Sequence, residues 1–243
     1  MILNNNYVQF EDLNRDGIFH FYTTNKNDFN LNMMEKNEAE EKVISFCKEN
    51  GFAVPKVKFG RQQHTTNVSI VTEDNINDDF TDTDGLVTNL KNVALTSFSA
   101  DCQSIIIYDP VREIIGNVHS GWKGTLNRII KEGIKRFKEL GSNPNDIEVY
   151  ICPSLLCFEV DLDVVELFRN NFDDIEDCIS LGDIKDNVQK YYIDTVKVNV
   201  KTLNKLGVNK IVNADMCTKC NTSFHSYRRD KNKMRNLALV MLN

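Results

Sequence analysis

The sequence is poor in the features that mark membrane, secreted and nucleic-acid-binding proteins. Its 243 residues include one Trp, four Pro and four His, and no apolar run approaches the roughly twenty residues that span a bilayer. The first ten residues, MILNNNYVQF, lack the basic-then-apolar order of a secretory signal. Basic residues are too few to cover a phosphate backbone, because 29 Lys and Arg stand against 35 Asp and Glu, a net charge of −6. We therefore expect a protein that binds neither membrane nor nucleic acid.

The seven cysteines are an odd number, and without a secretory signal they are more typical of reduced thiols than of a disulfide framework. We therefore expect a cytoplasmic protein. No repeat and no Pro- or Gly-rich linker divides the chain, so we expect one domain over residues 1–243. Strand-like and helix-like segments follow one another without strict alternation, which favours the α+β class.

Apolar spacing predicts four main helices. They cover residues 38–50, 126–140 and 161–172, followed by one that Asp194 caps. Thr125 is the expected cap of the second, and Leu167 is expected to point inward on the third. The Asn-rich segment 25–37 predicts a loop. The strand-like segments are 7–10, 17–24, 55–61, 68–72, 86–88, 93–98, 146–152, 208–213 and 237–242.

The most informative stretch is 99–125, SADCQSIIIYDPVREIIGNVHSGWKGT. Two apolar segments flank a turn at Asp109-Pro110, the pattern of a β-hairpin. Cys102 and His119 stand at its outer ends, and in an antiparallel pair these ends meet. His64, after the strand-like segment 55–61, completes a His/Cys/His set. Three protein ligands with one open position are typical of catalytic zinc, and imidazole and thiolate also suit copper.

Other readings of these residues stay open at this point. Cys102 and the histidines, taken singly, are more often core or hydrogen-bonded residues than ligands. Asp101 is a candidate to orient a histidine, cap a turn or pair with Arg. The cation-rich SYRRD segment 226–230, with Arg235, suits anion binding or an internal ion pair. Cys217 and Cys220 lack a second CxxC and predict a loop with free thiols, and His20 in a strand predicts a structural histidine.

Eight short motifs together resemble the YfiH-like family, known as polyphenol oxidase or laccase-domain proteins and understood as purine nucleoside enzymes. ADC at 100–102 and HSGWKGT at 119–125 are the specific ones. The others, in the order of the family, are QQH at 62–64, DP at 109–110, PS at 153–154, FEV at 158–160, CT at 217–218 and FHSYRRD at 224–230. The chain departs from the family at Lys123, where Arg is commoner, and at Cys152, where glycine is usual.

The resemblance implies a four-layer αββα sandwich and a zinc ion held by His64, Cys102 and His119. It also implies phosphorolysis of adenosine, inosine, guanosine and S-methyl-5′-thioadenosine, and hydrolytic deamination of adenosine. The partners are then purine nucleosides and phosphate, and we assign Arg228 and Lys123 to phosphate. Monomer and homodimer are both compatible with the sequence.

Two alternative functions use the same residues. In a Cys-His hydrolase or deamidase, Cys102 attacks a carbonyl as a thiolate beside His119, without a metal. In a copper-dependent polyphenol oxidase the His/Cys/His set binds copper. One thiol and two imidazoles are too few for the several coppers of a laccase, so copper ranks below zinc.

Overall fold

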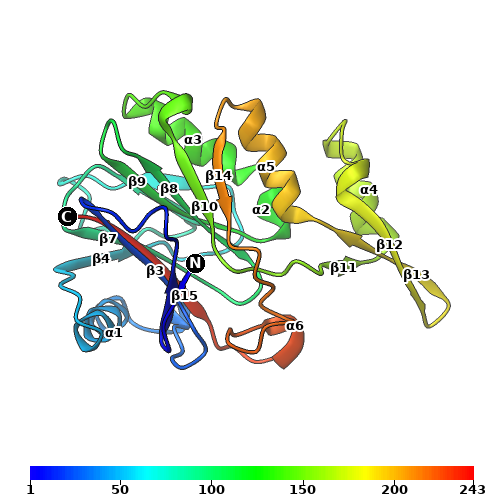
Figure 1. The fold of residues 1–243 in the computed structure, drawn as a ribbon, viewed down its shortest axis with the longest axis horizontal. Coiled ribbons are helices and arrows are strands. Elements are labelled where there is room, and N and C mark those ends of the chain that lie inside the picture. Colours follow the sequence, from blue (N-terminus) through cyan, green and yellow to red (C-terminus); the bar gives the residue numbers. More distant parts are fainter.

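Two six-stranded sheets lie face to face in the computed structural model, which describes residues 1–243 (Figure 1). The first sheet runs, in spatial order, β1 (Ile2–Leu3), β2 (Tyr7–Gln9), β3 (Ile18–Thr23), β15 (Asn236–Leu242), β7 (Val93–Ser99) and β4 (Lys56–Phe59). The second runs β14 (Lys210–Asn213), β10 (Glu148–Ile151), β8 (Gln103–Asp109), β9 (Ile114–Ser120), β6 (Gly85–Thr88) and β5 (Val68–Ile70).

Strand β8 shows why the apolar run QSIIIYD is continuous. Ile106 and Tyr108 point into the core between the two sheets, whereas Ile105 and Ile107 point to the opposite face, against helices. Side chains alternate along a strand, so a strand that is covered on both faces can carry consecutive apolar residues, here Ile105–Tyr108. The predicted hairpin is confirmed: β8 pairs with β9 in antiparallel register, Ser104 opposite His119.

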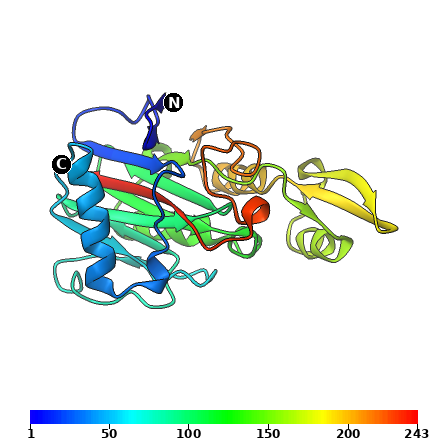
Figure 2. The same cartoon turned by 90° about the horizontal axis from the view of Figure 1, so that it is seen from below.

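Helices cover the outer faces of both sheets. Helix α1 (Lys36–Glu49) packs on the first sheet, where Val43 and Phe46 meet Phe21 and Leu239. Helices α3 (Ile129–Glu139) and α5 (Thr195–Lys205) pack on the second. The view from below shows α1 lying across the sheet that contains β3 and β15 (Figure 2). The expected mixed α+β organisation as a single domain is confirmed. No helix has the length and apolar character that crossing a bilayer requires.

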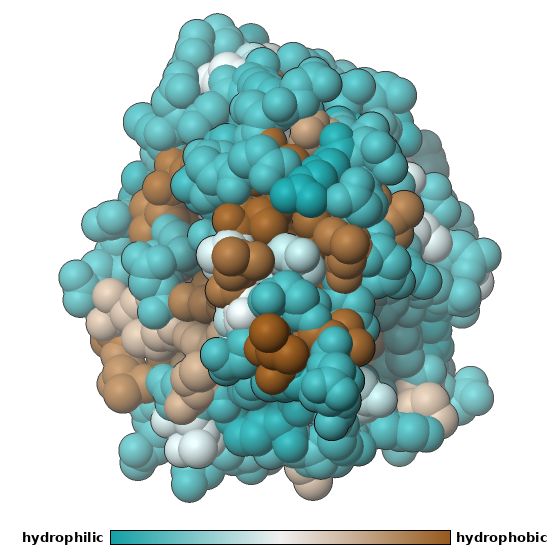
Figure 3. Space-filling model, turned by 90° about the vertical axis from the view of Figure 1, so that its right-hand side faces the viewer, coloured by the Kyte–Doolittle hydropathy of each residue, from teal (hydrophilic) through white to brown (hydrophobic).

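A third sheet was not predicted. It consists of β11 (Glu159–Val160), β13 (Val188–Ile193) and β12 (Ile179–Lys185), with helix α4 (Leu162–Asn171) packed against β13, and it projects from the two main sheets (Figures 1 and 2). Strand β12 is largely exposed and mixes polar and apolar residues, so its sequence carries no clear strand period. At this end of the molecule, hydrophobic patches (brown) interrupt a mostly hydrophilic surface (teal) (Figure 3). The exposed apolar side chains of α4 and this hairpin are Leu162, Leu167, Leu181, Ile184 and Val188.

Three details of the predicted helices were wrong. Residues 126–140 do not form one helix: α2 (Trp122–Leu126) ends before Arg128, which has a left-handed φ of 58°, and α3 begins after it. Thr125 is therefore not a cap; it is buried inside α2, and its hydroxyl bonds that of Ser120. Leu167 is exposed, because only one stripe of α4 faces the core.

The segment 25–37 is more structured than the predicted loop. It contains a 3₁₀ turn, Leu31–Met33, and buries Phe29 and Leu31 in the core beneath α1. The apolar residues of this segment are separated by Asn and Asp, which hid their burial. Two further 3₁₀ turns lie at Pro144–Asp146 and Glu176–Cys178, and the short helix α6 (Tyr227–Asp230) precedes β15. Asp194 caps α5 as predicted, accepting the backbone N–H of Lys197 at 2.8 Å.

Candidate functional site

The hairpin brings Cys102 and His119 to one edge of the second sheet. Cys102 immediately precedes β8, and His119 is the second-last residue of β9. Gln103 pairs with Ser120, so Cys102 lies opposite Gly121, where β9 gives way to α2. The close approach needs glycine here: a Cβ on residue 121 would lie 2.6 Å from His64 Cδ2 and 3.0 Å from Cys102 Sγ.

His64 reaches the same point from the loop after β4. The side chain of Gln62 anchors this loop to β7, donating to Phe98 O at 2.9 Å and accepting Phe98 N–H at 2.9 Å. His64 itself has a left-handed φ of 61°, a conformation that costs a non-glycine residue about 1–2 kcal/mol. Three successive amides, from residues 63–65, donate to the carboxylate of Asp84 at 2.7–3.1 Å. The carboxylate thus stabilises the strained turn that carries His64.

Asp84 also fixes the ring of His119. Gly85 pairs with Val118, so Asp84 lies beside His119, and the two side chains meet at 2.9 Å between Oδ1 and Nδ1. Burial raises the pKa of Asp84, but its hydrogen bonds with His119 and Thr65 outweigh burial and lower it to about 2. An ionised carboxylate requires a proton on Nδ1, so the other ring nitrogen, which faces Cys102, is the one that a metal ion would bind in place of a proton. The sequence reasoning missed Asp84, since nothing local in the turn-rich segment 73–84 marks it.

The three ligand atoms converge. Cys102 Sγ lies 3.7 Å from His64 Nε2, the two imidazole rings are 5.0 Å apart between centroids, and all three ligand atoms lie within 4.8 Å of one another. At zinc bond lengths of about 2.3 Å to sulfur and 2.0–2.1 Å to nitrogen, tetrahedral ligands stand about 3.6 Å apart. The residues therefore fit a metal ion of this size, and the Asp84–His119 pair is the outer support that metal-bound histidines have.

The electrostatics of the cluster favour a thiolate. Burial raises the pKa of Cys102, but hydrogen bonds and charge from His119 and His64 outweigh it and lower the pKa to about 6. Burial lowers the pKa of His119, but hydrogen bonds to Asp84 and Cys102 outweigh burial and raise it to about 9. Cys102 is thus prepared either to bind a metal or to act as a nucleophile.

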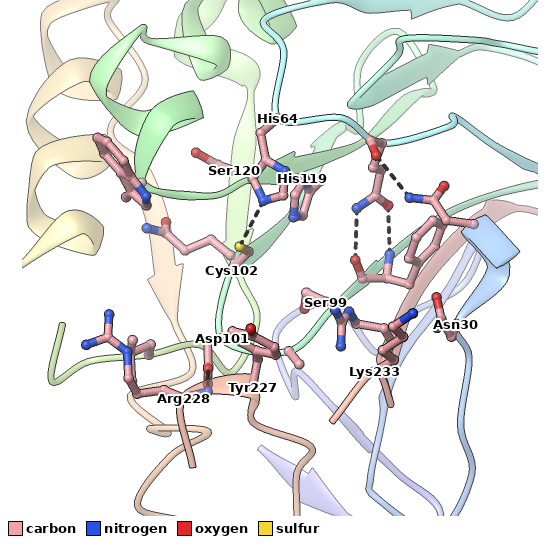
Figure 4. Close-up of a pocket in the computed structure, with 18 of the residues that line it drawn as sticks. Asn30, His64, Ser99, Asp101, Cys102, His119, Ser120, Tyr227, Arg228 and Lys233 are labelled. Atoms are coloured by element: carbon pink, nitrogen blue, oxygen red, sulfur yellow. Dashed lines mark hydrogen bonds between the residues drawn. The ribbon is translucent and has the colours of Figure 1, made fainter. Parts of the chain in front are cut away.

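A cavity of about 690 Å³ opens beside the cluster. Figure 4 shows His64, Cys102 and His119 on one side and Tyr227, Arg228 and Lys233 on the facing side. Arg235 also lines the cavity. Apolar and aromatic walls are contributed by Phe98, Trp122, Leu155, Phe158 and Tyr227. The size and the mixture of apolar walls with a few polar groups are typical of a small-molecule site.

The cations of the cavity have no carboxylate partner. Arg228 Nη1 donates to the carbonyl of Glu159 at 2.9 Å, and Arg235 Nη1 donates to the carbonyls of Asn232 and Met234. Arg228 also lies over the ring of Phe158, 5.4 Å from its centroid. Lys123 is different: it is exposed on α2 and is not among the residues that line the cavity. Arg228 and Lys123 are therefore not brought together.

The remaining candidates have structural partners. Asp101, at φ 89°, accepts the backbone N–H of Arg228 at 2.6 Å and the hydroxyl of Thr218 at 2.7 Å, so it holds α6 and does not orient a histidine. His20 is buried and accepts the N–H of Phe10 at 2.8 Å, which confirms the structural histidine. A Cβ on Gly124, in the HSGWKGT motif, would meet Ile129, Ser120 and the backbone oxygen of His119, but no ligand side chain.

Comparisons with known proteins assign the chain to a family. The model of the multi-copper polyphenol oxidoreductase laccase family, here called YfiH-like, matches residues 21–243. The chain belongs to the YfiH-like family. This YfiH-like chain is 32% identical over 216 residues to a purine nucleoside phosphorylase of Borreliella burgdorferi, covering 88% of each chain. It is 30% identical over 181 residues to adenosine deaminase RL5 of an unknown prokaryotic organism, covering 70% of this chain and 68% of that one.

The fold of this YfiH-like chain also matches a solved structure along its length. The hypothetical protein YfiH of Bacillus licheniformis superposes with a TM-score of 0.85 at 25% identity, covering 99% of this chain and 97% of that one. The third sheet is therefore included in a match that spans nearly the whole chain. The resemblance drawn from the short motifs is confirmed.

Proposed function

We propose that this YfiH-like protein is a purine nucleoside enzyme whose metal ion, zinc, is held by His64, Cys102 and His119. The proposed reactions are phosphorolysis of adenosine, inosine, guanosine and S-methyl-5′-thioadenosine, and hydrolytic deamination of adenosine. The observation that carries the proposal is the His/Cys/His cluster facing cations without carboxylate partners across one cavity. Relatives named purine nucleoside phosphorylase and adenosine deaminase support the substrate class.

Each side chain has a defined task in this proposal. When bound, zinc supplies a Lewis acid and a nucleophile at neutral pH. Asp84 keeps the proton on His119 Nδ1, and His119 in turn favours the thiolate of Cys102. The aromatic walls, Trp122 and Phe158 among them, offer faces against which a purine ring stacks. Arg228 offers a planar donor to an oxyanion such as phosphate.

The two reactions differ in their co-substrate. Deamination replaces the C6 amino group of adenosine with an oxygen from water and releases ammonia. Phosphorolysis transfers the sugar from the base to phosphate and yields the free base and the sugar 1-phosphate, which is ribose 1-phosphate for adenosine, inosine and guanosine. A substitution that disturbs only phosphate binding should therefore impair phosphorolysis and spare deamination.

The direct test is incubation of zinc-loaded protein with a panel of nucleosides, with and without phosphate, followed by chromatography of the products. Free base that appears only with phosphate identifies phosphorolysis, and inosine with ammonia from adenosine identifies deamination. The absence of both products with every nucleoside of the panel would refute the proposal. Cys102→Ser, assayed beside the wild type, shows whether turnover depends on the cluster.

Arg228 and Lys123 form a matched pair of variants. Arg228→Gln is expected to raise the KM for phosphate at least tenfold with little effect on deamination, because Arg228 lines the cavity. Lys123→Gln is expected to have the smaller effect, because its ammonium is exposed on α2. Equal phosphate KM values for Arg228→Gln and the wild type would remove Arg228 from the proposed phosphate site.

A metal-free Cys-His hydrolase is the second candidate, favoured by the low pKa of Cys102, about 6, and the 3.7 Å contact between its sulfur and His64 Nε2. Removal of metal by a chelator distinguishes the candidates: the zinc enzyme loses activity and regains it with added zinc, whereas the thiol enzyme keeps it. Copper-dependent oxidation of phenols, suggested by the description of the family model, requires phenol turnover that copper restores.

A further inference from the structure

Three cysteines outside the cavity form a second cluster of possible metal ligands. Cys157 lies just before β11, and Cys217 and Cys220 lie in the loop between β14 and α6. Cys157 Sγ is 3.7 Å from Cys217 Sγ and 3.8 Å from Cys220 Sγ, and all three sulfurs lie within 4.8 Å of one another. All three are free thiols in the structure. The fold thus adds Cys157 as a third sulfur to the CxxC segment, which the sequence offered only as an isolated pair.

The spacing of the sulfurs suits zinc. Tetrahedral ligands at a Zn–S bond length of about 2.3 Å stand about 3.8 Å apart, close to the two short distances of the cluster. A disulfide requires about 2.05 Å between sulfurs, so none of these pairs is bonded. Three thiolates are also the soft ligands that select zinc over magnesium or calcium.

The ionised cysteines would place three like charges close together, because the three sulfurs lie within 4.8 Å of one another. Three thiolates this close repel one another, and a divalent cation removes that repulsion.

Of the two loops that carry the cysteines, the one with Cys157 also forms part of the cavity wall. The two loops are joined by backbone bonds from Ser154 N–H to Met216 O at 3.1 Å and from Thr218 N–H to Ser154 O at 2.9 Å. Leu155 and Phe158, on either side of Cys157, line the cavity. The hydroxyl of Thr218 donates to the carboxylate of Asp101, which is the residue that precedes Cys102. An ion that joined the loops would fix this wall.

We propose that Cys157, Cys217 and Cys220 bind a second zinc ion, which ties the cavity-wall loop that carries Cys157 to the loop between β14 and α6. Each cysteine that is protonated before binding loses its proton to solvent, and the fourth position is taken by water or another external ligand. The site is structural in role, since none of its three cysteines lines the cavity. It does not depend on the reaction proposed above.

Zinc content measures the proposal directly. Protein purified under reducing conditions and dialysed against buffered zinc is analysed by inductively coupled plasma mass spectrometry. The wild type is expected to hold two zinc ions per chain, Cys220→Ser one, Cys102→Ser one, and the double variant none. Cys47→Ala, on the core-facing side of α1, is the control and should hold two. Cys220 is exposed, so its substitution should leave the fold intact.

The outcomes separate this proposal from the proposed function. If the wild type holds one zinc ion and Cys102→Ser holds none, the second site is overturned. A Cys220→Ser protein that still holds two zinc ions also overturns it. One zinc that only Cys220→Ser abolishes supports the second site and refutes the zinc at His64, Cys102 and His119. Cobalt gives a second readout on folded Cys102→Ser protein: sulfur-to-cobalt charge-transfer absorption is expected there, and its absence overturns the proposal.

Discussion

Asp84→Asn is expected to weaken metal binding at the His64/Cys102/His119 cluster by 10–100-fold, the usual effect of removing the partner of a metal-bound histidine. This equals about 1.4–2.8 kcal/mol of binding free energy. The reason is the tautomer of His119. Asp84 can only accept at Nδ1, whereas the amide of Asn can donate there, which would place the ring proton on the nitrogen that faces Cys102. A protonated nitrogen cannot bind a metal.

The same substitution should also destabilise the fold. Five hydrogen bonds end on the carboxylate, two at Oδ1 and three at Oδ2. An amide has one oxygen. With that oxygen in place of Oδ2, the N–H of His64 loses its acceptor, while His119 accepts from the amide instead of donating. At about 1.5–3 kcal/mol for a bond to a charged group, the free energy of unfolding should fall by about 1.5–3 kcal/mol. For a chain of this size Tm then falls by about 3–12 °C.

Competition with a chromophoric chelator gives the zinc affinity, and thermal melting followed by circular dichroism gives Tm. Asp82→Asn is the matched control, because Asp82 is exposed and its side chain forms none of these bonds; it should behave as the wild type. Both affinities should be measured in the Cys220→Ser background, so that only one site is counted. Wild-type zinc affinity in a folded Asp84→Asn protein would refute the argument from the tautomer.

Three further predictions concern other residues. Cys102→Ser should lose the metal of its cluster and nucleoside turnover while keeping the fold, because a serine hydroxyl stays protonated near neutral pH; metal analysis and circular dichroism measure this. Gly121→Ala should weaken metal binding at least tenfold without removing a ligand, because its Cβ would crowd His64 and Cys102; chelator competition measures it. The free energy of unfolding should fall by about 3 kcal/mol as pH drops from 6.5 to 4, because burial lowers the pKa of His20 to about 4 and the unfolded chain takes up the proton first; urea denaturation across this range measures it.

Each of these predictions has a control and a contrary result. Wild-type turnover by folded Cys102→Ser would exclude both the zinc and the thiol mechanism. Gly124 lies in α2, which begins just after Gly121, and its Cβ would contact no ligand side chain, so equal zinc affinities of Gly121→Ala and Gly124→Ala would contradict the crowding argument. His20→Gln can still accept the amide of Phe10 but does not titrate, so a pH dependence as steep as that of the wild type would rule out His20 as its cause.

The sequence determined the parts of this protein that local pattern controls. The run QSIIIYD and the Asp109-Pro110 turn predicted the hairpin, and pairing of antiparallel strands then brought Cys102 to His119. Apolar spacing predicted α1, α4 and α5, and the short motifs indicated the family. These features depend on side-chain period, turn chemistry and residues close in sequence, all of which are visible without coordinates.

Only the tertiary structure decided the residues that surround the cluster. Asp84 supports His119 because β6 pairs with β9, a register set by packing of the whole sheet. Cys157 joins Cys217 and Cys220 because two loops about sixty residues apart in sequence pair through Ser154. The left-handed Arg128 that interrupts the predicted helix and the exposed hairpin β12–β13 have no distinctive local period. Contacts between distant segments depend on how the elements pack, and local propensity does not encode that arrangement.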